Sequence, residues 1–165
     1  MVLKKLSLIL SSISLLFAGA LKAQDQIDRT AFYASMAADD INKINEQLKI
    51  VDALSTSEKD AYYGALLMKK AGLVKGPGNK LSVFKEGHKK LEAAITKNNA
   101  NTEFHFLRLM IQENAPGFLG YKSDMKNDSD LIKKSYKDLP QVVQHAIVDY
   151  SKKSKILKPQ DFNLQ

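Results

Sequence analysis

The segment Thr102-Glu-Phe-His-Phe-Leu-Arg-Leu-Met-Ile-Gln-Glu-Asn114 is the most informative stretch of the chain. Its apolar side chains fall on almost every side of a helix rather than on one stripe: Phe104, Phe106, Leu107, Leu109, Met110 and Ile111. A helix that is apolar nearly all round has to be enclosed by other elements. Asn101 is a favoured residue type for the N-cap, and Ala115-Pro116-Gly117 ends the run. The segment therefore predicts a central helix that is surrounded by the rest of a helical bundle.

A narrow polar stripe interrupts the apolar surface of this predicted helix. His105, Arg108 and Gln112 are separated by three and four positions, so they share one side of the helix. Arginine is rarely buried without a partner. In one interpretation the stripe meets solvent, or pairs with a carboxylate such as Glu46 or Asp60 and orients two helices. In the other, the stripe is a ligand site in which the Arg108 guanidinium binds a carboxylate or phosphate.

Helical periodicity continues on both sides of the central segment. Residues 27–54 form either one long helix or, as we prefer, two helices divided near Asp39-Asp40, where the acidic pair caps the second helix. Glycine and proline in Gly76-Pro77-Gly78-Asn79 predict a loop. The other predicted helices cover 58–71, 81–97, a short segment from Asp128 or Ser129 to about 139, and a last segment that starts at Pro140. Residues 24–165 therefore form one all-α domain of five to seven helices in antiparallel pairs, because no alternating run or hairpin signal predicts a strand.

Residues 87–111 resemble the junction of two tetratricopeptide repeats. The matching positions follow the repeat's order of small and large side chains around a turn at 98–101: Gly87, Leu91, Ala94, Phe104, Leu107 and Ile111. The sequence departs from the repeat at Asn99, where the family has a proline, and at Arg108, where it has a small residue. The resemblance implies antiparallel helix pairs, in a tetratricopeptide-like or irregular bundle. It implies no binding residues, because the ligand positions of this repeat vary.

The N-terminus has the order of a secretory signal peptide. Lys4 and Lys5 precede an apolar run at 6–17, and small residues follow it. Cleavage is expected after Ala23, or less favourably after Ala20, so residues 1–23 are assigned to the signal peptide. The alternative is a retained anchor or a buried first helix, but the run is shorter than the roughly 20 residues of a permanent membrane span. The sequence thus predicts an exported protein, periplasmic or secreted, of a type common in bacterial envelopes.

The composition excludes several kinds of site. The chain has no cysteine, which excludes disulfides, thiolate zinc sites, a cysteine nucleophile and a lipid anchor on cysteine. Removing the three lysines of the signal peptide lowers the net charge from +7 to +4, too little to predict nucleic-acid binding. Lysines around the glycine-rich quartet form either one basic rim or an ordinary solvated surface: Lys69, Lys70, Lys75, Lys80, Lys85, Lys89 and Lys90.

Three patterns resemble known sites but lack their requirements. Residues 76–82 lack both the preceding strand and the Gly-Lys-Ser/Thr ending of a phosphate-binding loop. One set of calcium-like side chains lacks the glycine and distal glutamate of a calcium loop: Asp124, Asn127, Asp128 and Asp130. The histidines fall on separate predicted helices: His88, His105 and His145. We therefore predict no metal, no cofactor and no catalytic set.

The connector after the central helix is apolar and contains Phe118, Leu119 and Tyr121. It either plugs the open end of the bundle, which we prefer, or forms an exposed patch for a partner. Together these observations favour a non-catalytic, exported helical module that binds another envelope protein or a peptide. The alternative function is a bundle that binds a small anionic ligand or a lipid through Arg108.

Overall fold

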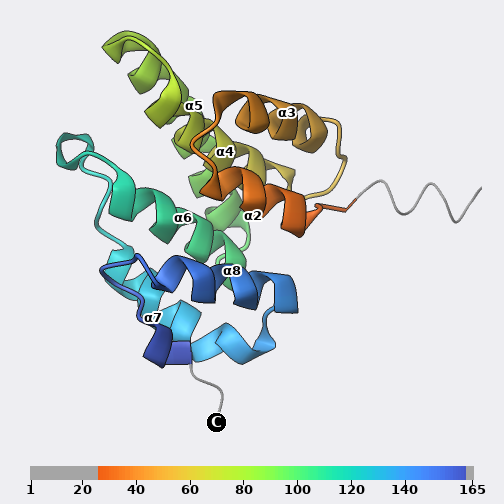
Figure 1. Ribbon diagram of the computed structural model, residues 1–165, viewed down its shortest axis with the longest axis vertical. Helices are drawn as coiled ribbons and strands as arrows, with labels where there is room; N and C mark the ends of the chain where they lie inside the picture. Colours follow the sequence, from red (N-terminus) through yellow and green to blue (C-terminus); the bar gives the residue numbers. More distant parts are fainter. Residues whose placement is uncertain (1–25, 163–165) are drawn as a thin grey trace, which may run out of the picture.

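The computed structural model describes residues 26–162, and it is helical throughout (Figure 1). Short 3₁₀ turns at Gly117–Leu119, Tyr136–Asp138 and Pro159–Phe162 accompany seven α-helices in this part of the chain: α2 (Arg29–Ala37), α3 (Ile41–Asp52), α4 (Lys59–Leu73), α5 (Pro77–Lys97), α6 (Thr102–Asn114), α7 (Met125–Ser135) and α8 (Gln141–Ser151). The predicted all-α class is confirmed. The predicted signal peptide lies outside the described residues, and no helix within them is long and apolar enough to cross a bilayer.

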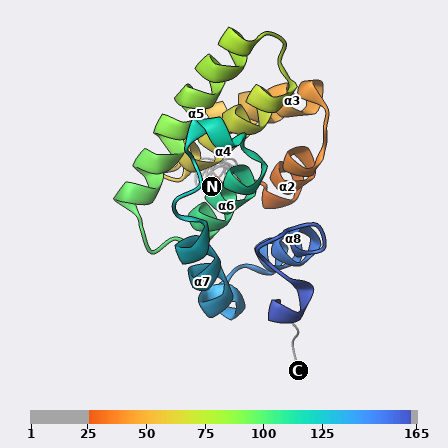
Figure 2. The same cartoon turned by 90° about the vertical axis from the view of Figure 1, so that its left-hand side faces the viewer.

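Helix α6 is the central element, as its apolar surface predicts. In the view of Figure 2 it lies between α5, α2, α7 and α8. Every residue from Thr102 to Gln112 is buried, including Leu107 and Leu109, which have no exposed surface. The side chain of Asn101 accepts hydrogen bonds from the backbone N–H groups of Glu103 (3.0 Å) and Phe104 (3.3 Å), which confirms the predicted cap.

Residues 27–54 contain two helices, α2 and α3, rather than one. Asp40 lies between α2 and α3, and its carboxylate accepts from the backbone N–H of Asn42 at 2.8 Å. This cap satisfies a donor that the first turn of α3 leaves without a partner. Helix α2 is tied to α6 by the buried carboxylate of Glu103, which accepts from Arg29 Nε (2.8 Å) and the Tyr33 hydroxyl (2.9 Å).

Helices α4 and α5 form a closely packed pair at Gly64 and Gly87. A Cβ atom on Gly64 would lie 2.7 Å from the carbonyl oxygen of Gly87 and 2.8 Å from the backbone nitrogen of Leu91. A Cβ atom on Gly87 would lie 2.5 Å from the carbonyl oxygen of Gly64. The two backbones can approach this closely only because both positions lack a side chain.

The predicted loop at Gly76-Pro77-Gly78-Asn79 is wrong for three of its four residues. Only Gly76 precedes the helix, with a φ of 82° that favours glycine, and Pro77 is the first residue of α5. Proline suits this position because its fixed φ is helical and the first helical N–H needs no partner. Helix α4 likewise continues through Gly72 to Leu73, beyond its predicted end.

The C-terminal region also differs from the prediction. Helix α7 begins at Met125, so Asp128 and Ser129 are buried inside the helix rather than capping it. The segment at Pro159–Phe162 packs on the bundle, since the Phe162 ring is buried against Tyr136 with 4.8 Å between centroids.

A single carboxylate fastens the end of α8 to α6. Glu113 accepts hydrogen bonds from the Tyr150 hydroxyl (2.9 Å), the Ser154 hydroxyl (2.6 Å) and the backbone N–H of Lys155 (2.5 Å). We call these contacts the Glu113 clasp. The clasp fixes where α8 ends relative to the central helix.

Candidate functional site

The polar stripe on α6 lies at its contacts with α5 and α7. Arg108 donates from Nε to Asp128 Oδ2 (2.8 Å) and from one terminal nitrogen to Asp128 Oδ1 (2.7 Å), a two-pronged ion pair. Its other terminal nitrogen contacts Glu92 Oε2 at 2.9 Å. The carboxylate partners are therefore Asp128 and Glu92, not the expected Glu46 or Asp60. Charged groups of three helices meet at this guanidinium, which sets the relative position of α5, α6 and α7.

His105 belongs to the same cluster. Its Nδ1 lies 2.6 Å from Asp128 Oδ1, and its Nε2 lies 2.9 Å from the carbonyl oxygen of Asn99. Burial raises the pKa of the Asp128 carboxyl, but hydrogen bonds from Arg108 and His105 outweigh it and bring the pKa below its usual value. Asp128 is thus an ionised carboxylate with no exposed surface, held by two basic side chains.

Gln112, the third residue of the stripe, is fully buried, and its side-chain amide makes no hydrogen bond within residues 26–162. The structure therefore brings His105 and Arg108 together at one carboxylate but gives Gln112 no part in that cluster. None of the three lines the large cavity on the side of α6 that faces α2 and α8.

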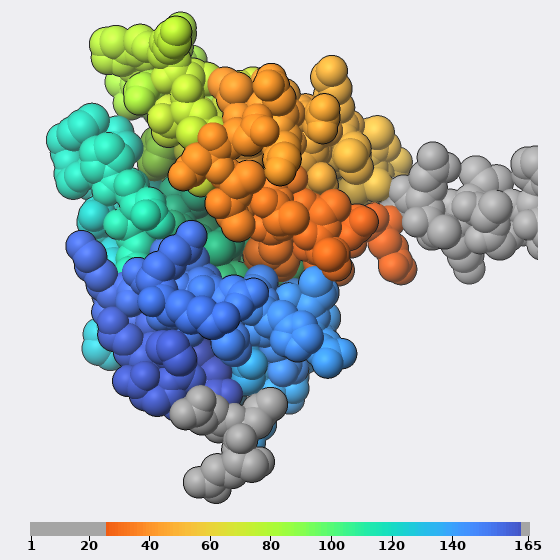
Figure 3. All heavy atoms as spheres, in the orientation of Figure 1, coloured from red at the N-terminus to blue at the C-terminus, as the bar shows by residue number. Residues whose placement is uncertain are grey.

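A large groove opens on the side of α6 that faces α2 and α8. Its volume is about 1310 Å³, and it is lined by residues of α2, α4, α5, α6 and α8 and of the connector after α6. In Figure 3, α6 is recessed between α2, in orange, and α8, in blue. We call this cavity the α2–α8 groove. Its floor includes three buried methionines from three helices, Met36, Met68 and Met110.

The wall formed by α8 is more polar than the floor. Gln141, His145 and Asp149 are spaced by four residues, so they lie along one side of the helix, and all three line the groove. Val142 and Ala146 add apolar surface beside them. One wall can therefore contact polar groups of a ligand while the floor contacts apolar ones.

The residues of the apolar connector differ in position: one is buried in the bundle, as a plug would be, and one is exposed, as a partner patch would be. Phe118 is 86% exposed, and both Phe118 and Leu119 line the groove. Tyr121 is buried instead, where its hydroxyl donates to the Glu92 carboxylate and its ring meets His88 edge-on at 4.6 Å. Tyr121 thus plugs the bundle, whereas Phe118 presents an aromatic ring to solvent at the edge of a cavity.

The histidines and acidic side chains of the described residues offer no group that would hold a metal ion. His88, His105 and His145 lie on α5, α6 and α8, respectively. In the calcium-like segment Asp128 binds Arg108, and Asp130 pairs with Lys126 at 2.7 Å. The acidic residues of this segment therefore serve the helix contacts and the surface of α7.

Sequence reasoning identified Phe118 and Leu119 but missed most residues of the groove. The floor methionines fit the core pattern of their helices, and nothing local separates them from other core residues. The four-residue spacing of Gln141 and His145 was a usable signal, because it marks a polar edge beside the apolar face of α8.

Comparison with known proteins gives no functional assignment for this chain, so the proposal below is based on the groove. No protein-family model, no curated protein and no solved structure matches this chain.

Proposed function

We propose that this protein is an exported binding module whose α2–α8 groove holds an amphipathic segment of another envelope protein or a peptide. The observation that carries the proposal is the groove itself, about 1310 Å³ with an apolar floor and a polar wall. Sites for small molecules usually measure about 300–1,000 Å³. The larger volume favours an extended occupant.

The chemistry of the lining suits an amphipathic helix. Such a helix lays its apolar face in a groove and leaves its polar face toward solvent or polar side chains. The floor at Met68 and Met110 would receive the apolar face, and the α8 wall at His145 and Asp149 would receive the polar one. Methionine side chains are unbranched and polarisable, so they adapt to ligands of different shape.

Phe118 supplies an anchor for the same partner. Large exposed apolar side chains at the edge of a cavity are typical of interaction sites, and aromatic residues dominate the energetics of many interfaces. Phe118 is the most exposed of the large apolar side chains of the described residues, and it lines the groove.

The alternative function, a small anionic ligand or lipid bound through Arg108, has less support. The Nε atom and both terminal nitrogens of Arg108 already contact Asp128 and Glu92, and the side chain is only 9% exposed. An anionic ligand would have to displace these internal carboxylates. A lipid would therefore be expected in the α2–α8 groove rather than at Arg108.

Binding of a labelled amphipathic peptide to residues 24–165 tests the proposal. The peptide carries leucine and phenylalanine on one helical face and neutral polar residues on the other. Ala146→Trp fills the groove and should weaken binding at least about tenfold, or roughly 1.4 kcal/mol. Ala93→Trp is the matched control, because Ala93 is an exposed residue of α5 outside the groove.

Fluorescence anisotropy gives the affinities, and thermal melts verify that both tryptophan variants fold. If the wild type binds no peptide, or if the two variants bind it equally well, the groove is not a peptide site.

The exported location rests on the pattern of residues 1–23. Protein recovered from the periplasm or the medium of an expressing bacterium should begin at Gln24, or to a lesser extent at Leu21. N-terminal sequencing checks this. A mature protein that retains Met1 would contradict export by cleavage.

A further inference from the structure

Three lysines surround one end of the α2–α8 groove. Helices α2 and α8 lie side by side and run in the same direction (Figure 1), so Thr30 and Gln141 line one end of the groove, and Asp39 and Lys153 line the other. Lys69 from α4 and Lys80 from α5 also line the groove. We call Lys69, Lys80 and Lys153 the lysine collar.

The collar carries more positive charge than its surroundings neutralise. Lys69 Nζ lies 2.7 Å from Asp39 Oδ1, and the pKa of the Asp39 carboxyl is lowered by this hydrogen bond, by the charge of Lys69 and, least, by the charge of Lys153. Lys80 Nζ donates to the carbonyl oxygen of Gly72, at 3.3 Å. Among the described residues, Asp39 is the only carboxylate within salt-bridge distance of any collar lysine. The three ammonium groups of the collar therefore have one carboxylate, that of Asp39, to neutralise them.

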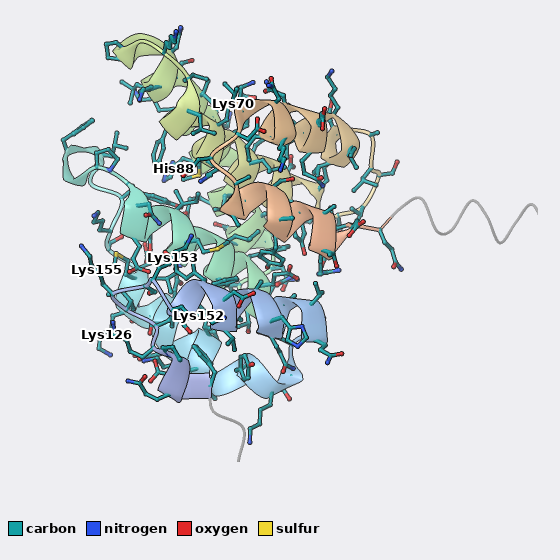
Figure 4. All side chains as sticks on the ribbon, in the orientation of Figure 1. Lys70, His88, Lys126, Lys152, Lys153 and Lys155 are labelled. Carbon is teal, nitrogen blue, oxygen red and sulfur yellow. The ribbon has the colours of Figure 1, made fainter. Side chains whose placement is uncertain are left out.

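Neighbouring acidic residues do not correct this excess. Asp149 lines the groove, but its ion pair is with Lys152 at 2.6 Å. Lys153 instead has its ammonium 5.7 Å from the centre of the Tyr150 ring. Figure 4 shows Lys152, Lys153 and Lys155 where α8 ends, and of these Lys155 adds a positive charge beside the collar.

Helix dipoles account for only part of the collar. Lys69 lies near the C-terminal end of α4 and Lys153 just after α8, where a positive charge is favourable. Lys80 lies in the first turn of α5, where a positive charge is unfavourable. The Lys80 ammonium also donates to the Gly72 carbonyl oxygen in the last turn of α4, so it bridges the end of α4 and the start of α5 at the groove.

We infer that the occupant of the groove carries a cluster of carboxylates at one end, held by the lysine collar, while its apolar face lies on the methionine floor. This inference rests on the proposed function and specifies the chemistry of the partner. The exposed apolar side chains of Leu81 (40%) and Phe118 (86%) also line the groove and would add to its contact with the apolar face. Because the collar lies at one end of the groove, it also fixes the direction in which the bound segment lies.

Two peptides with the same apolar face test the inference. One carries three glutamates at one end, and the other carries glutamines at those positions. The glutamate peptide should bind residues 24–165 at least about tenfold more tightly at an ionic strength of about 0.02 M, and the difference should shrink in about 0.5 M salt.

Charge reversal in the collar assigns the effect to its residues. Lys80→Glu/Lys153→Glu should abolish or reverse the preference for the glutamate peptide. Lys97→Glu/Lys134→Glu makes the same change in net charge at exposed lysines outside the groove and should preserve it. The glutamine peptide should bind the wild type and both variants alike, which shows that the groove remains intact.

The outcomes separate the two proposals. A preference that survives in the collar variant, or equal binding of both peptides to the wild type, overturns the collar inference and leaves the peptide groove standing. Failure of both peptides to bind overturns the proposed function as well. Binding to phosphatidylglycerol vesicles but to neither peptide would overturn the peptide partner and assign the groove to anionic lipid.

Discussion

Replacing Arg108 with leucine should lower the free energy of unfolding by about 3–5 kcal/mol. The substitution leaves the fully buried Asp128 carboxylate without the guanidinium that donates two hydrogen bonds to it and balances its charge. Removing one partner of a buried ion pair usually costs this much, because the abandoned charge remains in a poorly solvated site. Urea denaturation of residues 24–165 measures the loss.

A double variant supplies the first control. Arg108→Leu/Asp128→Leu removes both charges, so it should recover most of the stability lost in the single variant. Its His105 side chain keeps the hydrogen bond to the Asn99 carbonyl oxygen. A single variant as stable as the wild type would mean that the ion pair does not hold α6 against α7.

The dependence of the loss on pH supplies the second control. In the wild type the folded pKa of Asp128 is lowered, so its contribution to stability is present above the unfolded pKa of about 3.9 and is lost as the pH falls through the folded pKa. Without Arg108 the buried carboxyl prefers its protonated form. The difference in unfolding free energy between the wild type and Arg108→Leu should therefore become smaller as the pH is lowered from 7 toward 4.

Replacing Gly64 with leucine should destabilise the protein by about 3 kcal/mol, near the upper end of the usual cost of overpacking. Its Cβ atom alone would lie 2.7 Å from the Gly87 carbonyl oxygen and 2.8 Å from the Leu91 backbone nitrogen. These are backbone atoms, so no change of rotamer relieves the clash, and α4 and α5 have to separate. Thermal and urea unfolding of the variant measure the cost.

Gly72→Ala is the matched control for this prediction. Gly72 lies in the same helix, but a Cβ atom there has no neighbour within 4 Å. Alanine is the better helix former, so this variant should match the wild type or exceed it by up to about 1 kcal/mol. If Gly64→Leu proves as stable as Gly72→Ala, the close approach of α4 and α5 is not needed for the fold.

The sequence predicted those parts of the fold that depend on local interactions. Asn101 and Asp40 cap helices because their side chains bond to backbone groups two or three residues away. The apolar surface of α6 predicted its central place for a similar reason, since the signal lies within one segment. The start of α5 was also readable, because proline favours the first position of a helix, but the adjacent glycines obscured it.

The parts that failed depend on contacts between distant segments. The sequence left solvent, a carboxylate partner or a ligand open for Arg108, and no local rule selects Asp128, on the next helix, over Glu46 or Asp60. The groove is harder still to predict from the sequence, because it is the space left where the helices do not pack against one another. Met68 lines it from α4 and Ala146 from α8, and neither residue carries a sign of it alone.

The Glu113 clasp bears on the order in which the protein is made. Glu113 is synthesised before its partners Tyr150, Ser154 and Lys155, so α6 emerges from the ribosome without the helix that it later fastens. Until the last residues arrive, the methionine floor of the groove has no opposite wall and stays accessible to solvent. Transiently exposed apolar surface of this kind promotes aggregation during synthesis. Closure of the clasp, and with it the α8 wall of the groove, therefore has to wait until residues 150–155 have left the ribosome.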